Sequence, residues 1–185
     1  MGITDKKLKD KRFKQTEKAI IRAFFSSREF LSIRVMVRRA RISRSTLYRH
    51  HRTIYGIIPD YEEYILKKYS RLMSGLIKRD VVKVKTIYHQ MLIFILKNKN
   101  VFKMVVGRGG VRVLEKMIKK IEVIIMTEYA LPKNCEKLLN IYRKEVVGVI
   151  ERWIKSGFLE DELMVLSDIM YLTKTMRSRL GPLNE

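Results

Sequence analysis

The sequence predicts an all-α fold of about nine helices, and three observations support this prediction. Apolar residues recur at three- and four-residue spacing in one segment after another, while no segment shows the alternation of a convincing strand. Only three of the 185 residues are proline, and Leu, Ile, Lys and Met are abundant, which favours helix. Since 46% of the residues are hydrophobic, a chain of this length can bury a core without disulfides or metals.

The first part of the chain predicts a charged arm followed by a helix. Residues 1–12 are charged and poor in apolar side chains, and we expect a mobile arm there. Residues 14–27 place Ile20, Ala23 and Phe24 on one helical stripe, with two serines as stop signals.

Two short helices joined by a tight turn follow this first helix. Ser32 is a good N-cap for the segment IRVMVRRA, and Ser43 is a good N-cap for RSTLYRHH. Arg41 and Ile42 form the turn between them, which predicts a helix-turn-helix arrangement. The β-branched residues of IRVMVRRA also fit a strand, but a helix is preferred because a second capped helix follows at once.

The rest of the chain continues the helical pattern. Gly56 and Pro59 interrupt it, and a long helix starts at Pro59. We therefore predict two domains, residues 1–55 and residues 56–185. Four more helical segments are predicted, at residues 81–99, 111–130, 133–157 and 160–180. Residues 100–110 read as a short apolar turn that ends in glycines.

Charge is the strongest compositional feature of the chain. Forty Lys and Arg residues against nineteen Asp and Glu residues give a formal net charge of +21. Residues 1–52 contain sixteen basic and four acidic residues, so more than half of the excess lies there. A surface of this density favours nucleic acid as a partner and an anionic membrane second. The third interpretation is a basic surface that is merely solvated.

Several classes of protein do not fit the sequence. Cys135 is the only cysteine, so neither a disulfide within the chain nor a structural zinc site is expected. The sequence starts without an apolar signal-peptide segment, and its longest apolar runs are far shorter than the roughly 20 residues of a membrane span. We therefore expect a cytoplasmic protein with no membrane partner.

The histidines do not predict a catalytic or metal site. His50 and His51 are adjacent, so on a helix their side chains point about 100° apart and cannot easily bind one ion. Their neighbours are cationic, and the third histidine, His89, is distant in the sequence. No nucleophile-elbow motif is present. We expect no enzymatic activity, no metal and no cofactor.

The stretch SRSTLYRHH, residues 43–51, fits a helix that lies in the major groove of DNA. Leu47 would anchor this helix to the core beside Ile42, and the alternative is a surface helix whose arginines are only solvated. The residues predicted to read base edges are Arg34, Arg44, Ser45, Thr46 and Tyr48. The residues predicted to contact phosphates are Lys14, Arg49, His50 and Arg52. The arm of residues 6–12 would add nonspecific attraction to DNA.

The segment IRVMVRRARISRSTLYRHH resembles the helix-turn-helix of the TetR family of transcriptional regulators. The likeness depends on the run S-x-x-T-L-Y-R-H from Ser43 to His50, on the small Ala40 before the turn, and on the preceding helix TEKAIIRAFFSS. It covers roughly residues 12–52. The segment WIKSGFLEDELMVLSDIM also resembles the last helix pair of that family.

Two departures from the family pattern concern the turn and the end of the second short helix. The family favours glycine at the turn, where this chain has Arg41, and a positive φ there would strain a side chain. The family also places an aromatic residue and then a lysine after the histidine. Here His51 takes the aromatic position, and Arg52 takes the place of the lysine.

The resemblance implies a homodimeric repressor bound to a palindromic DNA operator and released by a small-molecule effector. Pairing would use the last two helices, about residues 134–155 and 161–179, because their wide apolar faces would be poorly covered in one chain. The alternative is that these faces only complete the core of a single chain. A second possibility, in another class, is a DNA-binding structural or interaction protein, nucleoid- or division-associated, or an activator that needs no effector. The side chains expected to line an effector cavity, or else to form plain core, are Tyr88, Met91, Phe94, Phe102, Met117 and Tyr142.

Overall fold

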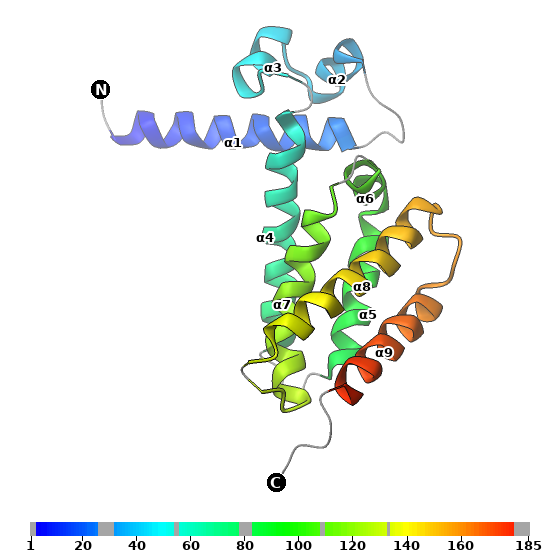
Figure 1. Ribbon diagram of the computed structural model, residues 1–185. Coiled ribbons are helices and arrows are strands. Elements are labelled where there is room, and N and C mark those ends of the chain that lie inside the picture. Colours follow the sequence, from blue (N-terminus) through cyan, green and yellow to red (C-terminus); the bar gives the residue numbers. More distant parts are fainter. Residues whose placement is uncertain are drawn as a thin grey trace. The chain divides into compact units, whose positions relative to one another are not determined.

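The computed structural model describes residues 3–25, 32–53, 56–77, 83–107, 110–132 and 134–179. These residues form nine helices and no strand (Figure 1), which confirms the predicted all-α fold. The chain divides into two compact units, residues 1–63 and residues 64–185. The division falls eight residues after the predicted boundary at 55, because helix α4 (Ile57–Ile77) is continuous and belongs to both units.

The first unit contains α1 (Ile3–Phe25), α2 (Ile33–Ala40), α3 (Arg44–His50) and the first residues of α4. Helix α1 packs against α2, and α2 packs against α3. The core of this unit consists of apolar side chains from all four helices. They are Ile20, Ile21, Ala23, Phe24, Met36, Ala40, Leu47 and Ile57.

Helix α1 is longer than the sequence pattern indicates. The prediction of a mobile arm over residues 1–12 was wrong, because the helix begins at Ile3. Its first part lacks an apolar stripe but is rich in Lys, which is a good helix former. Asp5 and Asp10 also each lie four residues before a lysine, a spacing that supports a solvated helix.

The second unit contains the rest of α4, then α5 (Val84–Lys97), α6 (Lys99–Val106), α7 (Arg112–Glu128), α8 (Glu136–Lys155) and α9 (Glu162–Ser178). Helices α8 and α9 lie side by side, and α5 packs against α9 and α7 (Figure 1). Residues 99–106 form a helix where a turn was expected, since Val101, Phe102, Val105 and Val106 recur at helical spacing and are all buried.

Most apolar stripes of the second unit face its core as predicted. Val84, Ile87, Met91 and Ile95 are fully buried on α5. Gly157 follows the end of α8 with a φ of +87°, a backbone region that glycine adopts without strain. Among the described residues, no helix combines the length and apolar character needed to cross a membrane.

Candidate nucleic-acid interface

The turn between α2 and α3 is short and closed by backbone hydrogen bonds. Ser32 begins α2, and its hydroxyl accepts a hydrogen bond from the amide of Val35 at 3.4 Å. Arg41 ends α2 in the left-handed region, with φ of 56° and ψ of 46°. The next amide, that of Ile42, donates to the carbonyl of Val37 at 3.0 Å and closes the turn. The positive φ anticipated for Arg41 is therefore present.

Helix α3 begins at a second serine cap. The Ser43 hydroxyl accepts a hydrogen bond from the amide of Thr46 at 3.0 Å. The same hydroxyl lies 2.8 Å from the hydroxyls of both Ser45 and Thr46. Arg49 then donates to the Thr46 hydroxyl at 3.2 Å. These contacts fix the first turn of α3 and leave its arginine at position 44 exposed.

The two faces of α3 differ sharply in exposure. Leu47 is 2% exposed and holds the helix on the core, whereas Tyr48 is 48% exposed. Thr46 is half-buried among its hydrogen-bond partners. The other predicted contact residues with exposed side chains are Lys14, Arg34, Arg44, Ser45, Arg49 and Arg52.

The two histidines at the end of α3 point toward α1. The prediction that His50 faces outward toward phosphate was wrong, since its side chain is only 6% exposed; that of His51 is only 2% exposed. His50 Nδ1 lies 2.7 Å from Glu17 Oε2, and His51 Nε2 lies 2.7 Å from Glu17 Oε1. The His50 ring also stacks on Phe13, with centroids 4.0 Å apart. His50 therefore presents little surface to a phosphate.

Glu17 was not among the predicted site residues, although the sequence holds a signal for it. Glu17 lies four residues after Phe13 and seven before Phe24, so it belongs to the apolar stripe of α1. A carboxylate on an inward stripe requires polar partners. Here the partners come from α3, 33 residues away in the sequence.

The described part of residues 11–53 is almost purely cationic among its charged side chains. Over residues 11–25 and 32–53 the chain has twelve Lys and Arg residues, all exposed, and one acid, Glu17. Arg38 and Arg41 belong to this exposed set, although the sequence interpretation left them out of the contact residues. Such a surface attracts a polyanion and gives phosphates many donors.

The six residues predicted to line an effector cavity are buried core residues of the second unit. The Tyr142 hydroxyl donates to the Tyr88 hydroxyl at 2.8 Å and lies 2.8 Å from the Thr173 hydroxyl. Burial raises the pKa of Tyr142 to about 12 and raises the pKa of Tyr88 well above its ordinary value. The ring of Phe94 contacts that of Phe102 edge-on. Both hydroxyls are therefore neutral and closely packed.

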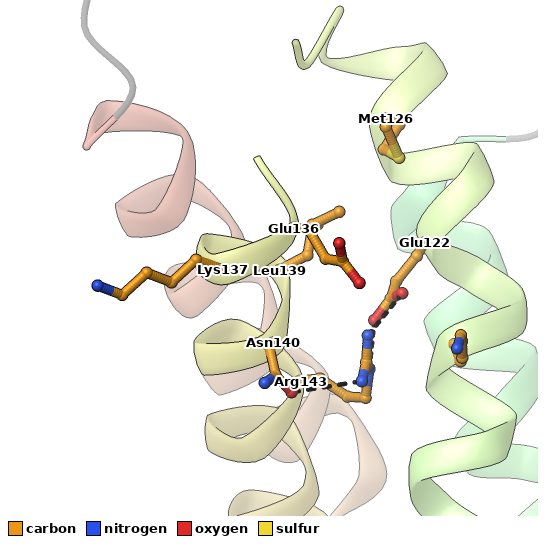
Figure 2. A pocket seen from close by; sticks show the side chains of 8 residues that line it. Glu122, Met126, Glu136, Lys137, Leu139, Asn140 and Arg143 are labelled. Carbon is orange, nitrogen blue, oxygen red and sulfur yellow. Dashed lines mark hydrogen bonds and ion pairs between the residues drawn. The ribbon is translucent and has the colours of Figure 1, made fainter. Parts of the chain in front are cut away.

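An open groove with a cavity volume of about 630 Å³ lies between α7 and α8 (Figure 2). Arg143 crosses it and donates to both oxygens of Glu122, through Nε at 2.5 Å and Nη2 at 2.9 Å. None of the six predicted effector residues lines this groove. Its lining residues are Lys119, Glu122, Met126, Glu136, Lys137, Leu139, Asn140 and Arg143.

Helices α8 and α9 carry several exposed apolar side chains. Ile141 on α8 and Leu163 on α9 belong to the apolar stripes that the sequence places on these helices, but they are 41% and 57% exposed. Met164 and Tyr171 on α9 are also more than half exposed.

Among the described residues, no group of three His, Cys, Asp or Glu side chains is arranged to hold a metal ion.

No protein-family model, curated protein or solved structure matches this chain. A function must therefore be inferred from its own residues. The most distinctive of these are the capped helix α3, its exposed polar face and the cations around it.

Proposed function

We propose that this chain is a sequence-specific DNA-binding regulator of transcription of the TetR type, acting in the cytoplasm as a homodimeric repressor. One observation carries the proposal. Helix α3 buries Leu47 and exposes Arg44, Ser45 and Tyr48, and residues 11–25 and 32–53 around it have twelve exposed cations and one acid. A short helix held on a core by one face, with arginine and small polar residues on the other, suits the major groove.

The exposed residues divide into two roles under this proposal. Arg44, Ser45 and Tyr48 on α3, with Arg34 on α2, read base edges. Thr46 contributes less directly, because its hydroxyl already bonds to Ser43 and Arg49. The phosphate contacts, which set register and general affinity, are Lys14, Arg49 and Arg52.

Pairing of two chains through α8 and α9 is the second part of the proposal. Ile141, Leu163, Met164 and Tyr171 place exposed apolar surface on these two helices. Exposed apolar surface of this kind suits burial against a second copy. A dimer brings two copies of α3 to half-sites about 34 Å apart on one side of the duplex, which requires a palindromic operator.

Release by a small effector is the third part of the proposal, and the α7–α8 groove supports it. The cavity volume of about 630 Å³ lies within the roughly 300–1,000 Å³ of small-molecule sites. The close packing of the predicted effector residues, such as Tyr88 and Tyr142, favours a second function instead. That function is a DNA-binding structural or interaction protein, or an activator, that works without an effector.

Selection of genomic DNA fragments by the purified full-length protein tests the proposal. We expect enrichment of a palindromic site near a promoter, with half-sites about one helical turn apart. Many enriched sites spread over a chromosome would favour the structural function. Fragments indistinguishable from unselected DNA would overturn sequence-specific binding. A steep loss of affinity with rising salt is expected in either case, because phosphate contacts displace counterions.

A further inference from the structure

One carboxylate connects α1 to the end of α3. Glu17 lies on the inward stripe of α1, and its side chain is 22% exposed. Its Oε2 accepts a hydrogen bond from His50 Nδ1 at 2.7 Å. Its Oε1 lies 2.7 Å from His51 Nε2, in an alignment outside that of a hydrogen bond. We refer to Glu17, His50 and His51 as the carboxylate clamp.

Helix α3 has only seven residues, so its placement depends on contacts with the rest of the unit. Ser43 caps its first turn, and Leu47 anchors its middle in the core. At its C-terminal end the amide of His51 donates to the carbonyl of Leu47, and the side chains of His50 and His51 contact the Glu17 carboxylate. The clamp thus holds the end that neither the cap nor the core contact holds.

The clamp also restrains rotation of α3 about its axis. The buried Leu47 side chain alone would leave the helix able to rotate about its axis. The contacts of His50 and His51 with one carboxylate, and the stacking of His50 on Phe13, oppose that rotation. A roll of α3 would shift Arg44, Ser45 and Tyr48 together, and base-edge hydrogen bonds tolerate only small shifts.

We infer that Glu17 is a positioning residue of the DNA-reading helix: through His50 and His51 it sets the orientation of α3 and thereby the sequence preference, without touching DNA. This inference rests on the proposed function. It concerns the ratio of specific to nonspecific affinity, not the affinity for DNA in general.

Charge alone predicts the opposite effect, which makes the inference testable. Glu17 is the one acid among twelve exposed cations in the described part of residues 11–53. Removing its negative charge strengthens the attraction of phosphates for this surface. Weaker binding to a selected site after its removal must therefore come from the position of α3.

The experiment compares full-length wild type with the variants Glu17→Ala, Glu17→Gln and Glu62→Ala. Glu62 is a half-buried acid in the same unit, with no hydrogen bond or ion pair to the described residues, so its variant removes an equal charge away from the clamp. Each protein is titrated with the site selected from genomic DNA and with a random duplex of equal length, at two salt concentrations.

Glu17→Ala is expected to lower affinity for the selected site about tenfold and to leave or strengthen affinity for the random duplex. Glu17→Gln keeps one acceptor oxygen, which suffices for His50, but puts an amide nitrogen in place of the second carboxylate oxygen beside His51, so we expect a loss of about threefold. Glu62→Ala is expected to keep the wild-type ratio. Thermal unfolding of each protein verifies that it is folded at the temperature of the titration.

An unchanged ratio for Glu17→Ala, or an equal loss on both duplexes, would overturn the inference. If Glu17→Ala does not fold, Glu17→Gln decides, and a wild-type ratio in that variant would overturn it as well. A wild-type protein that selects no site would overturn the proposed function, and this inference with it. That outcome is visible in the wild type before any variant is made.

Discussion

Arg143 on α8 donates two hydrogen bonds to the Glu122 carboxylate on α7, at 2.5 and 2.9 Å. The two side chains are only 18% and 9% exposed. The pair joins two helices within the second unit and forms part of the wall of the α7–α8 groove. It is thus both a structural contact and a boundary of the proposed effector site.

Arg143→Ala is expected to lower the free energy of unfolding by about 2–3 kcal/mol, because it leaves the buried Glu122 carboxylate without its main partner. Lys155→Ala is the matched control. Its ammonium lies 2.6 Å from Glu151 one turn away, but more than half of the Lys155 side chain is exposed, so the loss should be about 0.5 kcal/mol or less. Urea denaturation measures both, and equal losses would contradict the buried role of Arg143.

Alkaline pH is expected to destabilise the second unit through its tyrosines. Burial raises the pKa of Tyr142 from 10.0 to about 12, so the unfolded chain ionises first. The stabilisation is complete below pH 10, declines as pH rises through 10, and is lost by pH about 12. The total for Tyr142 is about 2–3 kcal/mol.

Unfolding free energies measured at several pH values, together with tyrosinate absorbance, check this prediction. The decline should be smaller in Tyr142→Phe, which has no ionisable hydroxyl at that position. That variant also loses about 1 kcal/mol at neutral pH with the hydrogen bond to Tyr88. Stability that stays flat from pH 9 upward would contradict the raised pKa.

Arg41→Gly is expected to stabilise the protein by about 0.5–1 kcal/mol, because φ at this position is 56° and glycine adopts that region without strain. Arg41→Val should instead destabilise it, since a β-branched side chain fits this region poorly. Both variants lose the same exposed charge, so the difference between their thermal midpoints isolates the backbone effect. A more stable Val variant would contradict it.

Arg44→Ala is expected to cost about 1–3 kcal/mol of affinity for the selected site and almost nothing on a random duplex. Arg52→Ala is the comparison variant, because Arg52 is exposed beyond the end of α3 and is assigned to phosphate. It should weaken both duplexes alike and lower the salt slope by about one. Equal losses on both duplexes for Arg44→Ala would remove its base-reading role.

The double variant Leu163→Glu with Met164→Glu is expected to convert a dimer into monomers, because it puts charge on the exposed apolar face of α9. Leu159→Glu is the control, since Leu159 is 84% exposed in the connection between α8 and α9. Sedimentation velocity separates the species. A double variant that sediments as wild type would exclude this face as the interface.

The sequence by itself determined much of the local structure. Ser32 and Ser43 are recognisable caps because their hydroxyls satisfy amides three residues later. The stripe of Val84, Ile87, Met91 and Ile95 predicted a buried helix face because the spacing alone puts these side chains together. These signals span a few residues and need no knowledge of what packs against them.

Only the tertiary structure decided which partners meet across the chain. The sequence predicted His50 as a phosphate contact, but α1 places Glu17 within 2.7 Å of both His50 and His51. Ile141 and Leu163 fit core stripes, yet both side chains are exposed in the fold. Periodicity says which side chains share a face, but burial depends on the helix opposite. Contacts between residues distant in sequence determine which helix lies opposite, and the local spacing of apolar residues does not predict those contacts.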